Sequence, residues 1–533
     1  MMNRRAKCIG VGQFGKWAIG GAGVLASLAL AGGASAQSSD PLLNALIKKG
    51  ILTEDEAKSI KAEADAAQSN NIPVIPSKWK ISDGIKSVEL FGDVRFRYEY
   101  RSASDPSGGF LAMNRYRYAL RFGLRGDLAD DFNYGFRLET AANPRSPWVT
   151  FGSSTTGVPY QGPFGKSTAG VNVGEIYLGW HPEDWFDITV GKMPQPLYTT
   201  SMVWDTDINP EGLAERFHYK VGEANFFGNF GQFIYQDTDP TSLSATGLVP
   251  SIPSGQGTRI PVLLAWQAGL VYQIETNMSF KVATTLYNYT SHGQNTAQRV
   301  PPLPGNPPAV VGPGFSDTFV GEGSSLNGAI TPAPYSGYSG YPNGQFSGFT
   351  TDQTGINDLL IVDVPFEFNF KISTLNAKIF SDIAENLNGH ERANAAVAAA
   401  AAQDGLTIPL HQNQDKAYQF GVAIGQHDGL GLVYGSTLKK GMWEARAYWQ
   451  HIEQYALDPN LLDSDFFEGR GNLQGVYFAT AYGLSDNIIA TLRGGYAHRI
   501  DQQLGTGGSN QDMPWVNPIN RYELMQVDLT YRF

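Results

Sequence analysis

The chain has 533 residues with 39 basic and 50 acidic side chains, and its one cysteine, Cys8, lies near the N terminus. The acidic balance argues against a nucleic-acid partner, because a phosphate backbone attracts proteins rich in Lys and Arg. Beyond residue 36 there is no cysteine and no apolar run of about 18 residues, so neither a disulfide nor a transmembrane helix is expected. A membrane role would therefore require a closed β-barrel.

Residues 1–36 have the pattern of a secretory signal peptide. Four basic residues precede an apolar run from Trp17 to Ala31, and the small residues Ala34, Ser35 and Ala36 follow as a cleavage site. We expect the chain to be exported and this segment to be removed. The remaining residues carry 35 basic and 50 acidic side chains, a net charge of −15.

Residues 37–86 predict a short periplasmic unit, a helical hairpin over 41–68 followed by a linker. An apolar stripe at helical spacing ends at Gly50, and Thr53 with Glu56 forms a capping box for the second helix. The hairpin has too little apolar surface to fold alone. It is expected to pack on the barrel, on a copy of itself or on the peptidoglycan of the cell wall, and the alternative is a mobile tail.

Residues 87–533 predict an all-β fold, a transmembrane antiparallel β-barrel. From Val88 to Arg101 apolar and charged side chains alternate, which is typical of a strand with lipid on one face and water on the other. Fifteen further stretches repeat this period of two, so we expect about 16 strands. The expected strands are 88–101, 114–126, 132–139, 171–181, 186–193, 213–221, 224–236, 262–275, 278–290, 359–372, 374–384, 417–426, 441–455, 472–484, 487–500 and 522–533.

The connections between these strands alternate between short and long. Outer-membrane barrels have short periplasmic turns and long external loops, so an even strand number with both termini in the periplasm is expected. The first long connection is expected at 102–113, and the loop 291–358 is rich in Pro and Gly, as suits an external loop. Residues 393–402 are almost all alanine and predict a short helix in another loop, whereas the connection 427–440 fits the alternation least well.

The last strand, 522–533, has a uniformly apolar face that ends in aromatic residues and a polar face that carries both charge signs. An edge strand of a soluble sandwich is the alternative to a lipid-facing strand. The segment resembles the closing strand of bacterial outer-membrane barrels, whose terminal aromatic residue is recognised by the barrel assembly machinery. That resemblance implies an assembly signal formed by Leu529, Tyr531 and Phe533.

Basic side chains dominate the face that the alternation assigns to the lumen on the first three strands. Four acids share this face and either neutralise the arginines or leave a net positive wall. Such a wall predicts weak anion selectivity, because charges that line a pore outweigh distant charges screened by salt. The arginines are Arg95, Arg97, Arg115, Arg117, Arg121, Arg125 and Arg137, and the acids are Glu89, Asp93, Glu99 and Glu139.

The sequence predicts no catalytic residue, cofactor or metal site. The eight histidines show no ligand spacing, and no nucleophile, histidine and acid can be grouped at one rim. Asp205, Asp207 and Asn209 alternate as in calcium loops, but the glycine and glutamate spacing of an EF-hand is missing. Acidity of an external loop is the simpler explanation.

Four fragments carry a resemblance to a known family: FGDVRFRYEY from Phe91, GKMPQP from Gly191, WDTDINPEGL from Trp204 and DSDFFEGRGNLQGVYFATAYGLSDN from Asp463. Together with the terminal Phe533 they are similar to the putative porin family of Gram-negative outer membranes. The similarity covers most of residues 42–533 and is weak in 291–358 and 391–403. It implies a channel in outer-membrane lipid that resembles the general porins and forms a homotrimer.

In general porins the third external loop folds into the barrel and narrows it, and the resemblance implies the same for 194–212. The acids of this region would then face the arginine wall, and the resulting transverse field would order water and orient polar solutes. These acids are Asp205, Asp207, Glu211 and Glu215.

The leading hypothesis for function is passive diffusion of small hydrophilic solutes and ions through a water-filled barrel. One alternative is a structural tether, in which the barrel anchors residues 41–68 to the cell wall. The other is a barrel hydrolase, which the missing catalytic grouping disfavours. Whether the pore is open cannot be read from the residues.

Overall fold

The computed structural model describes one unit within residues 82–533, with gaps. The predicted signal peptide, the hairpin 41–68 and the loop 291–358 lie outside the described residues. The described residues are 82–106, 108–141, 146–152, 170–235, 262–290, 359–399, 410–427, 430, 438–458, 461–506, 513, 516 and 518–533. No helix among these residues is long and apolar enough to cross a membrane.

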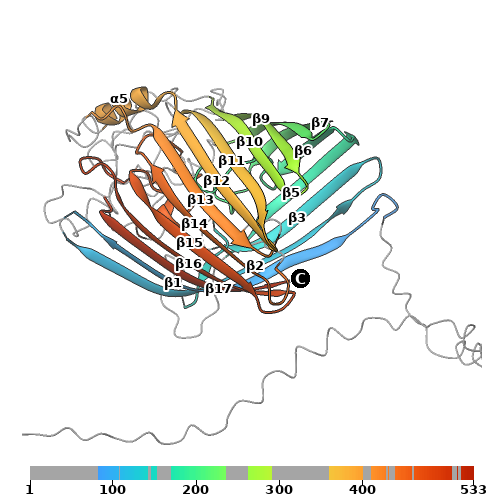
Figure 1. Cartoon of the computed structure of the whole chain (residues 1–533), viewed down its shortest axis with the longest axis horizontal. Coiled ribbons are helices and arrows are strands. Elements are labelled where there is room, and N and C mark those ends of the chain that lie inside the picture. Colours follow the sequence, from blue (N-terminus) through green and yellow to red (C-terminus); the bar gives the residue numbers. More distant parts are fainter. Residues whose placement is uncertain are drawn as a thin grey trace, which may run out of the picture. The chain divides into compact units, whose positions relative to one another are not determined.

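The described residues form a single antiparallel sheet of 17 strands, of which β4 is only two residues long (Figure 1). The long strands agree with the predicted ones to within a few residues at most ends. They are β1 (Glu89–Ser104), β2 (Phe110–Asp127), β3 (Phe132–Ala141), β5 (Gly170–Glu183), β6 (Phe186–Lys192), β7 (Glu211–Val221), β8 (Ala224–Ile234), β9 (Val262–Glu275), β10 (Met278–Tyr289), β11 (Leu360–Ile372), β12 (Leu375–Asn386), β13 (Lys416–Gly425), β14 (Trp443–Ile452), β15 (Leu473–Gly483), β16 (Ile488–Arg499) and β17 (Arg521–Arg532), and β4 is Val149–Thr150.

The sheet closes on itself because β1 pairs with β17 as well as with β2. The β1–β17 seam runs in unbroken antiparallel register from Asp93 opposite Arg532 to Ser104 opposite Arg521. Every other long strand pairs with the long strands that precede and follow it in the chain. The predicted barrel of 16 long strands is therefore confirmed, including β13 and β14, which pair directly despite the long connection between them.

The connections also alternate between short and long, as predicted. The exception is the long connection between β13 and β14. Tight turns such as 184–185, 222–223 and 276–277 lie at the end of the barrel where Phe533 is bonded to Gly92. The first loop is shorter than predicted, 105–109 rather than 102–113, because β1 and β2 continue to pair beyond the region of clear alternation. A helix, α5 (Gly389–Ala399), lies between β12 and β13 and contains residues 393–399 of the predicted helix 393–402, while residues 400–402 lie outside the described residues.

The two faces of the wall differ as the period of two requires. On β17, Val527 and Leu529 are 44% and 43% exposed on the outer face, while Gln526 and Asp528 are 0% and 2% exposed on the inner face. Phe533 continues the outer face and is also exposed. An exposed apolar band around a polar interior places lipid outside this barrel.

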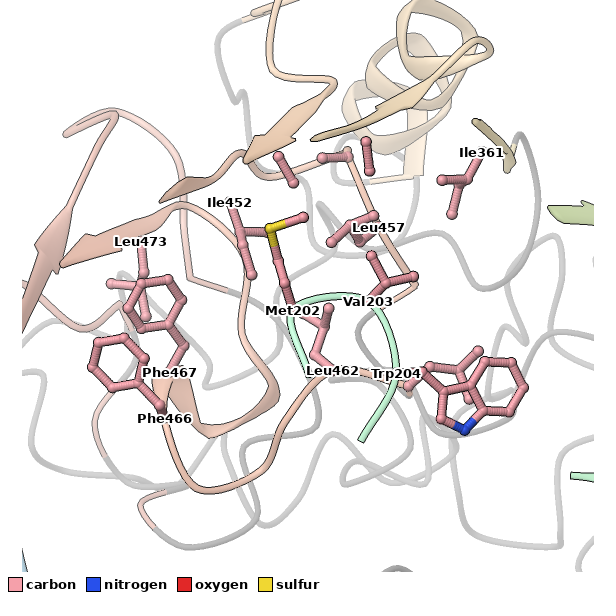
Figure 2. Packing of buried hydrophobic residues seen from close by; sticks show 14 of the residues in the cluster. Met202, Val203, Trp204, Ile361, Ile452, Leu457, Leu462, Phe466, Phe467 and Leu473 are labelled. Carbon is pink, nitrogen blue, oxygen red and sulfur yellow. The ribbon is translucent and has the colours of Figure 1, made fainter. Parts of the chain in front are cut away.

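Two loops pack together against the inner wall. Met202, Val203 and Trp204 belong to the β6–β7 loop (193–210), and Phe466 and Phe467 to the β14–β15 loop (453–472). Figure 2 shows these side chains gathered with Leu457, Leu462 and the wall residues Ile361, Ile452 and Leu473. An apolar core therefore occupies part of the barrel, a feature that the alternating strands alone do not predict.

Candidate functional site in the lumen

Inward-facing arginines of β1 and β2 lie side by side as a basic wall, the arginine wall, and Glu99 lies at its centre on β1. Arg101 and Arg115 contact its carboxylate at 3.0 and 2.5 Å, and Arg97 and Arg117 approach to 3.6 Å. The Glu99 side chain is fully buried among these four guanidinium groups. Because a buried charge is tolerated only when it is paired, Glu99 is held by these arginines and balances one of their four positive charges.

The β14–β15 loop binds the same wall through Asp465. Its carboxylate accepts hydrogen bonds from Arg97 at 3.0 Å, from Arg101 at 3.1 Å and from Gln526 at 3.0 Å. Arg97 also donates to Asp528 on β17 at 2.7 Å. The Arg97 side chain is fully buried and is thus shared between the wall and the loop.

The β6–β7 loop folds into the barrel, as the resemblance implies. Asp207 contacts Arg121 at 2.5 Å, and Glu139 lies 3.2 Å from the same guanidinium group. Asp205 instead accepts hydrogen bonds from the backbone N–H and the hydroxyl of Ser464, at 3.0 and 2.9 Å. The two loops are therefore joined to each other as well as to the wall.

Two carboxyl groups in these loops have perturbed acidities. Burial, reinforced by Asp207, raises the pKa of Asp205 well above its usual range. Burial and the neighbouring Asp465 raise the pKa of Asp463 to about 7. Asp463 can thus change its charge near neutral pH where the loops meet.

The remaining predicted arginines are also paired. Arg137 forms ion pairs with Glu175 and, at 3.3 Å, with Glu139. Arg125 pairs with Glu89 at 2.7 Å, and both side chains are more than half exposed. Arg95 pairs with Asp93 at 2.5 Å.

Glu211 and Glu215 are a correction, because the structure does not place them in the lumen. They lie on the face of β7 that carries Leu213 and Phe217, whereas Ala214 on the opposite face is buried. Glu215 is paired in register with Ile188 of β6 and Phe230 of β8, and Phe230 is 38% exposed on the outer wall. Glu211 was assigned to the loop because β7 begins two residues earlier than predicted, whereas Glu215 lies within the predicted strand 213–221, on the same face as Leu213 and Phe217.

The loop acids that do reach the arginine wall touch it instead of facing it across water. Asp207 and Asp465 contact the arginines directly, so these charges neutralise one another. Two alternatives were open: a strong transverse field at this wall, or arginines whose charge is compensated by acids. This arrangement favours compensation.

Two other inward cations have no carboxylate within 4.0 Å among the described residues. The Arg446 guanidinium lies 5.0 Å from the ring centre of Phe380 and 5.3 Å from that of Tyr448. The Lys281 ammonium lies 3.8 Å from the ring centre of Tyr198 in the β6–β7 loop. Aromatic faces attract a cation without cancelling its charge.

Several functional residues were missed by the sequence analysis. Arg101 is the last residue of the predicted strand 88–101 and shares the face of Arg95 and Arg97, but it was left out of the predicted arginine group. Arg446 and Lys281 also lie on alternating strands, but neither stands in a basic cluster. Asp465 lies in a loop without periodicity, and its contact with β1 depends on how the chain folds back.

A closed barrel with an apolar outer wall and a charged interior narrowed by loops defines a porin-type channel. A family model described as "Putative porin" matches residues 111–533, and the chain belongs to this family. Membership of this family and the barrel fold point to a channel in the outer membrane.

Two solved structures are similar over 84% of the chain at low identity. One, described as "Anion-selective porin from Comamonas acidovorans", is 10% identical with a TM-score of 0.37 and is covered over 99% of its length. The other, "Asymmetric conductivity of engineered proteins", is 9% identical with a TM-score of 0.34 and is covered completely. No curated protein matches the sequence.

Proposed function

We propose that the barrel carries small hydrophilic solutes and ions by passive diffusion and is weakly anion-selective. The observation that supports the selectivity is the position of Arg446 and Lys281, two inward cations without a carboxylate partner among the described residues. Paired arginines contribute little net charge, so these two side chains set the sign of the local potential. Low-dielectric walls focus the field of such charges on the passage.

The test is the reversal potential of the purified channel in a salt gradient across a planar bilayer. Wild type should favour chloride, and the double variant Arg446→Gln, Lys281→Gln should shift the potential toward cations. The matched control is Lys86→Gln, which removes one positive charge from an exposed residue ahead of β1. Equal potentials for wild type and the double variant would contradict the assignment, and a silent wild-type channel would favour the tether hypothesis.

We also propose that the barrel works as a homotrimer. Glu215 supports this idea, because a carboxylate on the outer wall between Ile188 and Phe230 is unfavourable in lipid and would be covered by a second barrel. Its neighbour Gln232 donates hydrogen bonds to it at 3.2 and 3.3 Å. Native electrophoresis of Glu215→Arg should show fewer trimers than wild type, and a monomeric wild type would contradict the proposal.

The signal-peptide cleavage after Ala36 and the peptidoglycan contact of residues 41–68 remain proposals. Mass spectrometry of the exported protein tests the cleavage site. Co-sedimentation with peptidoglycan, with and without residues 41–68, tests the tether.

A further inference from the structure

A belt of buried polar side chains crosses the inner wall behind the β6–β7 loop. Asn229 donates to Gln267 at 2.7 Å, and Gln267 donates to Thr285 at 2.7 Å. Gln267 also exchanges two hydrogen bonds with the backbone of Tyr198, at 2.9 and 2.8 Å. The belt therefore fixes the loop to the wall at one end.

At the other end the belt contains two acids, and no cation among the described residues acts on either of them. Asp363 on β11 and Asp382 on β12 are both 0% exposed, and Asp382 accepts a hydrogen bond from the hydroxyl of Thr200 in the loop. The two carboxyl groups are close enough to hydrogen-bond to each other when one is protonated, and no other described side chain donates to either oxygen of Asp363 or to Oδ1 of Asp382. Two adjacent buried carboxylates without a counter-charge are costly.

Neighbouring neutral groups also present oxygen to these acids. Gln419 is the register partner of Asp382, and it is 0% exposed. Its amide nitrogen donates to Gln450 on β14 at 2.7 Å, so its oxygen faces β12, and that oxygen has no donor in the described part of the chain. The Tyr287 hydroxyl is also buried, and the charge of Asp363 acts on it electrostatically.

This donor set consists of oxygen atoms only. Two carboxylates, one amide oxygen and the hydroxyls of Thr200 and Tyr287 match the preference of calcium, which takes six to eight oxygen ligands. Zinc prefers nitrogen and sulfur ligands, which this cluster lacks. No group of three or more His, Cys, Asp or Glu side chains able to hold a metal ion occurs in the described ranges, so this site depends on its amide and hydroxyl oxygens.

We propose that Asp363, Asp382 and the amide oxygen of Gln419 bind a hard divalent cation, Ca²⁺, which fastens the β6–β7 loop to the wall through Thr200. The sequence analysis expected no metal site. The ligands come from three neighbouring strands and one loop, so strand register brings them together rather than spacing along the chain. Bound calcium neutralises the two carboxylates and holds the loop in its inward position.

The experiment uses the full-length protein purified in detergent and treated with EDTA. Terbium(III) replaces calcium and luminesces when nearby aromatic side chains are excited, so Tyr287 and its neighbours report binding. We expect terbium luminescence that calcium displaces, and an unfolding temperature that calcium raises and EDTA lowers. Removing even an outer-shell partner weakens metal sites about 10- to 100-fold, so Asp363→Asn should weaken calcium binding at least about tenfold.

The control is Asp184→Asn, which removes an exposed carboxylate from the turn between β5 and β6 and should leave calcium binding unchanged. Equal terbium binding by wild type and Asp363→Asn would mean that the ion sits elsewhere on the barrel, and would overturn the proposal. The proposal would also be overturned if neither calcium nor EDTA changed the unfolding temperature of the wild type while Asp363→Asn raised it. The two carboxyls would then share a proton instead of a cation.

Discussion

Replacing Asp465 with alanine should release the β14–β15 loop from the arginine wall. The substitution removes one of the two carboxylates that Arg97 and Arg101 share, in a place where the side chains of both arginines are fully buried. Breaking a buried ion pair by removing one partner costs about 3–5 kcal/mol. Asp465 is 17% exposed, so we take the lower end, about 3 kcal/mol, which raises the undocked population on the order of 100-fold.

Single-channel recording in planar bilayers measures this effect directly. Phe466 and Phe467 still pack in the apolar core, so the loop should leave and return rather than stay outside. We therefore expect Asp465→Ala to show frequent transitions to a higher conductance than wild type, and faster cleavage of the loop by added protease. Asp465→Asn keeps an acceptor oxygen, so its conductance transitions and its cleavage rate should lie between those of wild type and Asp465→Ala.

The matched control is Glu223→Ala, which removes an exposed carboxylate from the turn between β7 and β8. It should conduct as wild type does. If Asp465→Ala also keeps the wild-type conductance and protease resistance, the contact between the loop and the arginines does not restrict the lumen, and our account of the narrowed barrel is refuted.

Three further outcomes are expected. Leu529→Arg places a cation on the lipid-facing wall, which costs about 2–4 kcal/mol near the bilayer midplane. The Leu529→Arg barrel should therefore unfold at a lower temperature than the barrel with Thr530→Asn on the opposite face. Equal unfolding temperatures would contradict the assignment of faces. Phe533→Asp should accumulate in the periplasm and be degraded, and normal outer-membrane levels would exclude a role for this residue in assembly. The pKa of Asp463 is raised from 3.8 to about 7, so between these pH values the docked loop holds a proton that the unfolded chain releases. Docking should therefore weaken as pH rises from about 4 to 7 and stay constant above. Asp463→Asn should remove this pH dependence from the rate at which protease cleaves the loop, and the same pH profile in wild type and variant would refute the role of Asp463.

The barrel could be predicted because a lipid-facing strand imposes its pattern on every second residue. In β17 the exposed Val527 and Leu529 and the buried Gln526 and Asp528 repeat the pattern seen in the sequence. The same logic gives the inward direction of Arg95 and Arg97. It was not applied to Glu211, which was assigned to a loop, or to Glu215, which was grouped with the loop acids although it lies in the predicted strand 213–221; both belong to the outer face of β7.

The contents of the lumen could not be predicted in the same way. The loops have no periodicity, so nothing near Asp465 in the sequence indicates that it meets Arg97 of the first strand. The belt acids Asp363 and Asp382 alternate like other inward residues, and only strand pairing shows that their carboxyls share one buried cluster. Ion pairs across a closed barrel depend on the whole topology, whereas faces depend on a few adjacent residues.

The link between the two loops also constrains the order of folding. The Ser464 hydroxyl and the Asp205 carboxylate that it contacts are 259 residues apart in the chain. Closing so long a segment is entropically unfavourable until intervening strand pairs have shortened it. The contact should therefore form after the wall has assembled, and a nascent barrel would pass through a stage with a wider interior than the finished protein.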